Sequence, residues 1–375
     1  MAGIACDPLP WNTVASRFRR LADGRWAAEK GGGGVNAVVF YEHGGPEVLH
    51  FGPYPTPEPR PGEALVRVGA VALNRLDIFV RQGMPGVHTP LPHITGGDVA
   101  GTVEALGPGA EGVRPGDRVL VDPAFGCGRC EYCLAGEVPR CLHGATLGEE
   151  VDGGLAEYVR VPAANLLPLP ERLDMVEAAS LPIAYGTAWR MLLTRGGLRP
   201  METVYIVGSG GVSVAALQIA RMAGARVIIS VGDDEKAAKA EALGADLVFN
   251  HRKADAVKTV REFTRKRGAD VVVDSVGRAT WAQSQVCLGK GGRLVTCGAT
   301  TGFDLATDAR YLFWREQSLI GSNGWTRGEL TALLAAVGRG AVKAVVERVY
   351  ALADAARAER DLEAHGAFGK LVLVP

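Results

Sequence analysis

The feature that most constrains the fold is a glycine-rich turn between a short apolar run and a helix-like stretch. The run TVYIV at 203–207 is typical of a buried strand, and the turn GSGG follows it at 208–211. Residues 212–223 have helical character, and Gly224 follows them as a C-cap. Glycine lets the backbone approach a phosphate closely, and the free N–H groups of a helix N-terminus bind anions. This order is therefore the context that a dinucleotide-binding turn requires.

The residues after this turn alternate between strand and helix patterns. Strands are expected at 226–231, 247–249, 270–274 and 293–297, with helices over 235–243 and 254–266. Alternation of this kind builds a doubly wound parallel sheet, which favours cofactor binding over the alternative of a plain tight turn. Ser213 stands where the fingerprint has its third glycine, and a small residue still permits close packing there. We assign to the cofactor Gly208, Ser209, Gly210, Gly211, Val212 and Ser213.

The end of the second strand of this region indicates which cofactor is used. An acid about 20 residues after the turn would hold the ribose 2′-hydroxyl of NAD, but the segment ISVG at 229–232 contains none. Asp233 and Asp234 follow, with helix capping as their alternative role. Lys236 and Arg252 would meet a 2′-phosphate, unless they are simply solvated. We therefore predict that NADP(H) is preferred over NAD(H).

The region before this alternation has a different residue pattern. Between residue 35 and about residue 170, short strand-like runs at 37–41, 64–71, 100–106 and 156–161 are separated by Gly- and Pro-rich turns. This pattern indicates a β-rich domain with many loops, and a chain of 375 residues favours two domains. Residues 1–34 form an N-terminal extension ending in four glycines. It is interpreted either as a poorly ordered tail or as a short amphipathic helix through Trp11, Val14, Phe18 and Leu21.

Four of the seven cysteines lie in one short loop with the spacing Cys127-x2-Cys130-x2-Cys133-x7-Cys141. Four thiolates with no open position describe a closed, tetrahedral, structural zinc site. An iron–sulfur cluster is the alternative, but the long last spacing and the lack of Pro after Cys141 differ from the bacterial ferredoxin run. Such a zinc ion would fold the lobe formed by residues 126–142 and take no part in catalysis.

Charge and hydropathy exclude several classes of partner. Lys+Arg and Asp+Glu both number 41, so there is no electrostatic reason to expect nucleic acid or an anionic membrane as a partner. No apolar run approaches the roughly 20 residues that cross a bilayer, and the N-terminus lacks the apolar stretch of a secretory signal. A cytoplasmic location and a small-molecule substrate are the expectation.

Beyond these features, several motifs after Val35 resemble the medium-chain dehydrogenase/reductase superfamily. They are GGPEVL at 44–49, GGDVAG at 96–101, RPGDRV at 114–119, TAW at 187–189 and GKLVL at 369–373. The cysteine loop is similar to the structural zinc lobe of the zinc alcohol dehydrogenase branch. The resemblance implies a GroES-like β-rich catalytic domain plus a Rossmann domain. The expected boundaries are 1–34 for the extension, 35–165 for the catalytic domain, 166–321 for the Rossmann domain and 322–375 for the return to the catalytic domain.

The departures from the zinc branch concern the catalytic metal. Asn74 stands where the first cysteine ligand would be, Gly97 and Asp98 replace a His-Glu pair, and no ligand type occurs around Ile183. The segment NRLD at 74–77 instead resembles the quinone oxidoreductase branch, which works without metal. The resemblance therefore implies reduction of an enone or a quinone by NAD(P)H. A ketone or alcohol dehydrogenase and a non-catalytic NADPH-binding protein are the alternatives.

The same resemblance assigns further roles. Asn74 is the candidate donor to the developing negative charge, Asp77 would position its loop, and Tyr185 is a candidate proton donor or else a wall residue. An edge strand at 319–321 implies a homodimer. The further cofactor-binding residues that it implies are Thr187, Ser275, Val276, Gly277, Cys297, Gly298 and Lys370.

Overall fold

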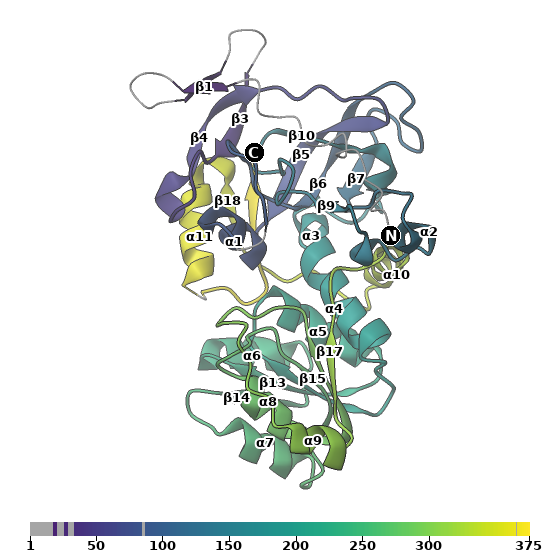
Figure 1. Cartoon of the computed structure of the whole chain (residues 1–375), viewed down its shortest axis with the longest axis vertical. Helices are drawn as coiled ribbons and strands as arrows, with labels where there is room; N and C mark the ends of the chain where they lie inside the picture. The colour runs from purple at the N-terminus through teal and green to yellow at the C-terminus, as the bar shows by residue number, and fades with distance from the viewer. Residues whose placement is uncertain (1–17, 21–25, 29–33, 85–86, 365) are drawn as a thin grey trace, which may run out of the picture. The chain divides into compact units, whose positions relative to one another are not determined.

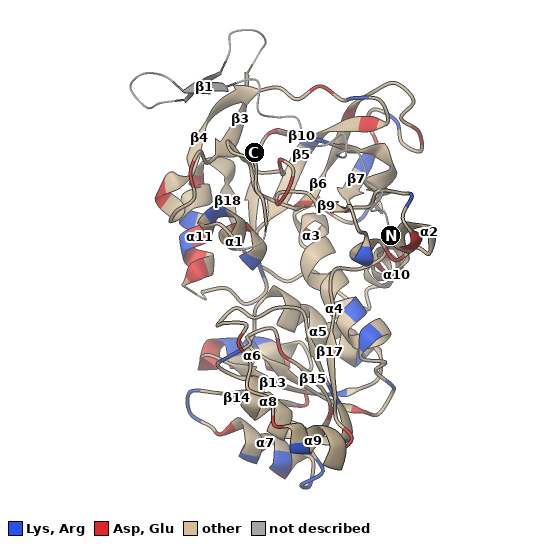
Figure 2. Ribbon diagram, in the orientation of Figure 1, with Lys and Arg blue, Asp and Glu red and all other residues tan. Residues whose placement is uncertain are grey.

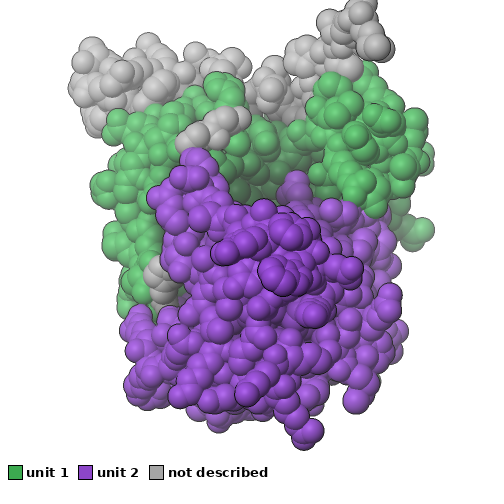
Figure 3. Space-filling view, turned by 60° about the horizontal axis from the view of Figure 1, so that its bottom comes forward, with its two compact units in different colours: residues 1–180, 348–366, 371–375 green, residues 181–347, 367–370 purple. Residues whose placement is uncertain are grey.

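The computed structural model describes residues 18–20, 26–28, 34–84, 87–364 and 366–375 (Figure 1). The chain divides into two compact units, coloured separately in Figure 3. Unit 1 comprises residues 1–180, 348–366 and 371–375, and unit 2 comprises residues 181–347 and 367–370. Among the described residues, no helix has both the length and the apolar character needed to span a membrane.

Unit 1 is built on a largely antiparallel seven-stranded sheet. Its strands run in the order β11-β7-β6-β5-β19-β18, with β10 also paired to β5. Most residues of β5 are buried on both faces of the sheet, and Arg67 is its exposed residue. The strands are β5 (Glu63–Ala72), β6 (Asp98–Leu106), β7 (Arg118–Val121), β10 (Tyr158–Pro162), β11 (Leu166–Pro168), β18 (Val346–Ala351) and β19 (Lys370–Val374).

Smaller strand pairs and helices complete unit 1. Antiparallel pairs join β3 (Gly34–Val39) to β4 (His50–Pro55), β8 (Ala124–Phe125) to β9 (Ala145–Thr146), and β1 (Phe18–Arg20) to β2 (Trp26–Ala28). The helical alternative for the extension is therefore wrong at 18–20, and the rest of that alternative lies outside the described residues. The helices are α1 (Arg75–Gln82), α2 (Glu131–Leu134), α3 (Met175–Ala179) and α11 (Ala355–Glu363).

Unit 2 contains a six-stranded parallel sheet in the order β14-β13-β12-β15-β16-β17. The first strand in sequence, β12, is buried along its whole length, as expected for a strand covered on both faces. Together with unit 1, this sheet confirms the predicted α/β fold class. The strands are β12 (Thr203–Val207), β13 (Arg226–Val231), β14 (Leu247–Asn250), β15 (Ala269–Val273), β16 (Leu288–Thr296) and β17 (Ser318–Gly321).

Helices pack against this sheet through one buried cluster in particular. Tyr205 and Val207 of β12 pack with Ala256, Val260 and Trp281 of two neighbouring helices, so apolar burial stabilises this face. The helices of unit 2 are α4 (Thr187–Trp189), α5 (Gly211–Met222), α6 (Asp234–Ala242), α7 (Ala256–Phe263), α8 (Trp281–Cys287), α9 (Ala309–Trp314) and α10 (Arg327–Gly338).

The domain boundaries differ from those expected from the sequence. Unit 2 begins at Leu181 rather than at residue 166, and the return to unit 1 comes at Arg348 rather than at residue 322. The reason lies in α10, whose Glu329 forms an ion pair of 3.1 Å with the buried Arg190 of unit 2. Leu330 and Leu333 of the same helix are fully buried, so residues 322–347 fold with unit 2.

Candidate functional site

The glycine turn lies at the carboxyl end of β12, directly before α5. Gly208 has a φ of +84°, a conformation that favours glycine, and Gly210 is the N-cap of α5 with no side chain capping it. A Cβ on Gly211 would lie 3.0 Å from Cδ of Lys370, which is 2% exposed. Ser213, in the place of the third glycine, donates a hydrogen bond of 3.0 Å to the Val207 carbonyl. The turn thus presents helix N–H groups and a buried lysine to one place, which suits a phosphate.

Two cations gather at the end of β13. A Cβ on Gly232 would lie 3.9 Å from a guanidinium nitrogen of Arg252, and Lys236 follows in α6. Burial, followed by the charges of Arg252 and Lys236, lowers the pKa of His251, which is therefore neutral near pH 7. Asp233 is occupied as the N-cap of α6, where it accepts the Lys236 N–H at 2.8 Å.

The other acid near this strand end is also occupied. Asp234 accepts hydrogen bonds from Asn250 Nδ2 at 2.9 Å and from Lys253 Nζ at 2.5 Å. Each acid therefore has a structural role, and the site gains positive character. Figure 2 colours the Lys and Arg residues of unit 2 blue and its Asp and Glu residues red.

The ends of β15 and β16 provide the next predicted residues. Asp274, fully buried, accepts the N–H groups of Val276 and Gly277 at 2.8 and 3.2 Å, and the hydroxyls of Thr280 and Ser284 at 2.7 and 2.6 Å. Asp274 is not among the residues expected from the sequence, although an acid closing an apolar strand was an available signal. Its four bonds order the segment 275–277.

The residues predicted after β16 and in α4 lie in the same unit. Cys297 and Gly298 follow β16, and burial raises the pKa of Cys297 to about 12, so its thiol stays protonated. Thr187 opens α4 and is 7% exposed. Because β12, β13, β15 and β16 are parallel, their carboxyl ends share one edge of the sheet, where such folds bind ligands.

Tyr185 is fully buried in unit 2. Its hydroxyl donates to the Lys343 carbonyl at 2.9 Å, and accepts from Val345 N–H at 2.9 Å and from Gln218 Nε2 at 3.3 Å. Burial raises the pKa of Tyr185 to about 12. These contacts favour the structural role and leave the hydroxyl no free proton to give to a substrate.

Asn74 lies in unit 1 as the N-cap of α1, within a network of buried acids. Its Nδ2 donates to Asp98 Oδ2 at 2.9 Å and to the Ala72 carbonyl at 3.3 Å. Asp77 accepts the Asn74 backbone N–H at 2.6 Å and the Gly96 N–H at 2.9 Å. Asp77 and Asp98 are 3% and 0% exposed. Asp77 makes the contacts that a positioning role requires, and Asp98 fixes the amide itself.

The contact between Asp98 and Asn74 was not foreseen, although a charged residue at the start of a buried strand was a usable signal. Arg81, in helix α1 after Asn74, has other partners than this network. It pairs with Glu359 of α11 at 2.5 Å, and neither side chain is exposed. A second missed residue is Glu149: burial, then the charges of Glu150 and Asp77, raises its pKa to about 7.

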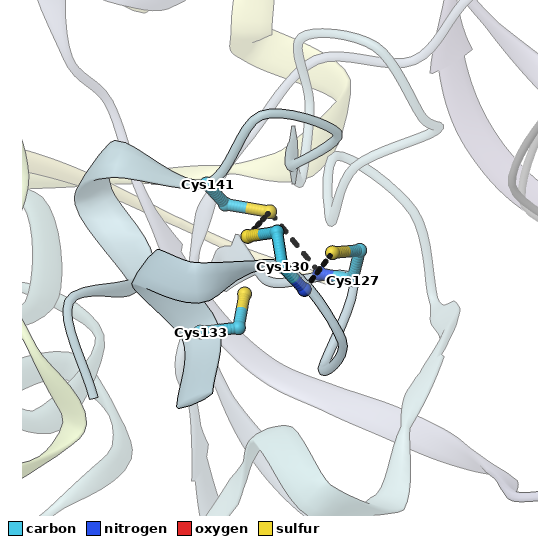
Figure 4. Close-up of side chains that lie close together, drawn as sticks. All are labelled: Cys127, Cys130, Cys133 and Cys141. Atoms are coloured by element: carbon cyan, nitrogen blue, oxygen red, sulfur yellow. Dashed lines mark hydrogen bonds between the residues drawn. The ribbon is translucent and has the colours of Figure 1, made fainter. Parts of the chain in front are cut away.

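The four cysteines converge at one point (Figure 4). Their sulfur atoms all lie within 4.8 Å of one another, and Cys130 Sγ is 3.8 Å from Cys141 Sγ. A tetrahedral zinc with Zn–S bonds of ~2.3 Å separates its sulfurs by about 3.8 Å. Backbone N–H groups of Cys127 and His143 point at Cys141 Sγ, at 3.3 and 3.4 Å, and suit a thiolate. The donor set and its spacing fit a structural zinc.

The residues that the resemblance places at the catalytic zinc positions present no comparable donor set. Asn74 and Asp98 are hydrogen-bonded to each other, Gly97 has no side chain, and Ile183 is aliphatic. In the described part of the chain, the cysteine group is the one cluster of three or more His, Cys, Asp or Glu side chains with suitable spacing for a metal.

Comparison with known proteins matches both units. Residues 60–171 match the family described as "Alcohol dehydrogenase GroES-like domain", and residues 211–339 match "Zinc-binding dehydrogenase". A NAD-dependent alcohol dehydrogenase of Sulfurisphaera tokodaii is 33% identical over 91% of this chain and 100% of its own length. The human quinone oxidoreductase is 29% identical over 91% of this chain and 98% of its own length.

Solved structures are also similar to this chain over most of its length. The crystal structure of a NAD-dependent alcohol dehydrogenase is 43% identical, with a TM-score of 0.88, and covers 91% of this chain and 99% of its own. The 2-octenoyl-CoA carboxylase reductase CinF, solved in complex with NADP and 2-octenoyl-CoA, is 29% identical with a TM-score of 0.83. That match covers 92% of this chain and 88% of CinF.

Proposed function

Because this chain belongs to the medium-chain dehydrogenase/reductase superfamily and is an oxidoreductase, we propose that it reduces an activated double bond or a quinone with NADP(H), without a catalytic zinc. The observation that carries this proposal is the Asn74–Asp98 hydrogen bond of 2.9 Å at the positions where the zinc branch has metal ligands. An amide anchored by a buried carboxylate is a hydrogen-bond donor and a poor zinc ligand.

The reduced nicotinamide supplies a hydride when it is bound. The carbonyl oxygen of an enone or quinone then becomes negative, and a positioned N–H stabilises that charge. We assign this donor to Asn74 Nδ2, whose weaker bond, 3.3 Å to the Ala72 carbonyl, is the one that a substrate oxygen replaces. Asp98 and Asp77 hold the amide and its loop, so they are positioning residues. The proton for the product comes from solvent in this proposal, since the Tyr185 hydroxyl is occupied.

The proposed preference for NADP(H) depends on the cations at the end of β13. Arg252 lies beside Gly232 at this strand end, and Lys236 is paired with Asp233 at 3.5 Å, so Arg252 is the cation that we assign first to a 2′-phosphate. A charge-assisted contact contributes about 1.5–3 kcal/mol, so Arg252→Ala is expected to weaken NADPH binding at least tenfold and to leave NADH binding unchanged.

Fluorescence titration with both cofactors measures this, and Lys290→Ala, which removes an exposed lysine elsewhere in unit 2, is the matched control. If the parent protein bound NADH as well as NADPH, the preference would be rejected.

The substrate class is tested by a panel. Purified protein with NADPH is given simple enones, quinones and an α,β-unsaturated acyl thioester, because CinF was solved with 2-octenoyl-CoA. Cofactor oxidation is followed by absorbance, and simple alcohols with oxidised cofactor form the opposing set. Reduction of a member of the first set is the expected result. Oxidation of alcohols with no reduction of enones or quinones would overturn the proposal.

The second candidate is a ketone or alcohol dehydrogenase. It is favoured by the four-cysteine lobe, where we propose one structural zinc, and by relatives named NAD-dependent alcohol dehydrogenases. A third candidate, a cofactor-binding protein without turnover, predicts NADPH binding with no oxidation by any member of the panel. Metal analysis separates the first two: about one zinc per subunit agrees with a structural site alone, and about two indicate a catalytic zinc.

A further inference from the structure

Unit 1 contains a cavity of about 410 Å³ that involves none of the residues assigned to cofactor or substrate. It is bounded by β4, by the proline-rich loop at 55–62 and by β10, with Asp152 among its lining residues. Its volume lies within the range of about 300–1,000 Å³ typical of small-molecule sites. All of its lining residues belong to the same unit, so the cavity is a feature of unit 1 alone.

Asp152 is the polar anchor of this cavity. Its Oδ2 accepts the Tyr54 hydroxyl at 3.2 Å, its Oδ1 accepts the Ile94 N–H at 3.1 Å, and His93 Nδ1 lies 3.5 Å from Oδ1. The Asp152 side chain is still 23% exposed, whereas Tyr54 is 8% exposed. Three neighbours, Tyr54 and the adjacent residues His93 and Ile94, therefore hold the carboxylate in one orientation, and part of it remains open to a ligand.

The charges around this carboxylate are not balanced. Arg160, the nearest cation, is directed to the buried Glu63, with Nε 3.0 Å from Oε2. Burial lowers the pKa of His93, so this ring supplies no positive charge near pH 7. Burial raises the pKa of Asp152 despite the opposing effects of His93 and Arg160. Among the described residues, the basic side chain within 4 Å of Asp152 is that of the neutral His93, and Arg160 acts on the carboxylate only from a longer distance, so a cationic ligand would compensate the carboxylate.

The walls of the cavity suit the apolar part of a cationic ligand. Tyr54 and Tyr158 contribute aromatic rings, and Pro57 and Pro162 contribute rigid aliphatic ones. Aromatic faces attract cations, and rigid walls lose little entropy when a ligand packs against them.

We propose that this cavity binds an organic ammonium ion, with the ammonium group on Asp152 and its apolar body between the tyrosine and proline rings. The ligand is a primary amine on an aromatic or branched aliphatic group. The site is independent of the reductase proposal, because it shares no residue with the cofactor site or with Asn74.

The test is calorimetric titration in phosphate buffer, with saturating NADPH present throughout. Benzylammonium is the probe and benzyl alcohol its neutral match. A hydrogen-bonded ion pair contributes about 1.5–3 kcal/mol, so benzyl alcohol is expected to bind at least tenfold more weakly. Asp152→Asn is expected to weaken benzylammonium binding at least tenfold. Glu171 is an exposed acid of unit 1 outside the cavity, so Glu171→Gln should leave that binding unchanged. Equal binding of probe and alcohol, or unchanged binding by Asp152→Asn, overturns the proposal.

Asp152 also holds the Ile94 backbone, so its variant is checked for folding by thermal unfolding. Thr56→Trp provides the second variant, because it fills the cavity from the loop and leaves Asp152 in place. Loss of benzylammonium binding by this variant with unchanged NADPH affinity supports the site. Benzylammonium binding retained by Thr56→Trp excludes the proposed site, even where Asp152→Asn does not fold.

Discussion

Asn74 shows how one side chain can change the chemistry of a shared scaffold. In the place of a metal-binding cysteine it presents an amide, and the buried Asp98 holds that amide by a bond of 2.9 Å. The amide can donate a hydrogen bond to a developing oxyanion, which is weaker than a Lewis acid but needs no metal. In our proposal, this one residue favours reduction of an enone or quinone over alcohol chemistry.

Replacing Asn74 with Ala is expected to lower kcat for enone or quinone reduction by about 10²–10³, the usual effect of removing one oxyanion donor. The dissociation constant of NADPH should stay unchanged, because the cofactor residues all lie in unit 2. Steady-state kinetics and fluorescence titration measure the two effects. Gln283→Ala removes an exposed amide elsewhere and serves as the control. A change in kcat within about twofold would show that Asn74 is no donor in the transition state.

The raised pKa of Glu149 predicts that the stability of the folded protein depends on pH. Its pKa in the folded protein is raised to about 7, chiefly by burial, whereas an unfolded Glu titrates near ~4.3. Between these values the folded state keeps the proton and the unfolded state loses it, so stability falls as pH rises through this window. Glu149→Gln should flatten the fall in Tm from pH ~4.5 to ~7, measured by thermal unfolding at several pH values.

The control for this series is Glu241→Gln, since Glu241 is exposed in α6. An unchanged pH profile of Tm in Glu149→Gln would mean that Glu149 is ionised in the folded protein at neutral pH.

At the scale of elements, the cysteine lobe has little apolar core of its own. Its helix α2 has four residues and no buried ones, and Leu134 and Leu142 are 76% and 61% exposed. We therefore expect the proposed zinc ion to supply most of the stability of this segment.

Cys133→Ser is expected to reduce zinc from about one per subunit to near zero, and to make the lobe at 126–142 the first site of limited proteolysis. Elemental analysis and mass spectrometry of the fragments give these readouts. Cys287→Ser, which changes a buried cysteine outside the lobe, is the control for zinc content. Full zinc content in Cys133→Ser would exclude the four-sulfur site.

The contact between α1 and α11 depends on a buried ion pair. Arg81 contacts Glu359, Glu363 and the Gly44 carbonyl, and charged residues of both signs follow α11 in Figure 2. Arg81→Met should lower the free energy of unfolding by about 3–5 kcal/mol, because it leaves Glu359 buried without its cation.

The double variant Arg81→Met with Glu359→Leu should recover most of this loss, since it removes the unpaired charge as well. Denaturant unfolding measures both variants. Equal losses in the single and double variants would contradict this explanation.

At the scale of the whole molecule, β17 is an edge strand whose one partner among the described strands is β16. Near it in sequence, Phe313 and Trp314 of α9 are 73% and 75% exposed. An exposed edge with large apolar side chains nearby favours pairing with a second copy. We therefore expect a homodimer of twice the 39.4 kDa chain mass, as measured by light scattering at micromolar concentration.

The variant Phe313→Lys with Trp314→Lys should shift the dimer towards monomer, while Phe51→Lys, an exposed aromatic residue of β4, should not. A monomeric parent protein would reject the dimer.

Much of this protein follows from local sequence. The glycine turn after β12, the strand–helix alternation and the spacing of the four cysteines are short-range patterns, and each has one favoured structure. They were sufficient for the fold class and for the convergence of the four cysteines. Local periodicity was less informative at the domain boundaries, since α10 has the same pattern whether it packs on one unit or the other.

Tertiary structure decided the features that depend on residues far apart in the chain. The bond from Asn74 to Asp98, the burial that raises the pKa of Glu149, the pairing of Arg81 with Glu359 and the three bonds that satisfy Tyr185 all join distant segments. The physical reason is that burial and hydrogen-bond partners are set by packing, whereas strand and helix patterns are set by neighbouring residues.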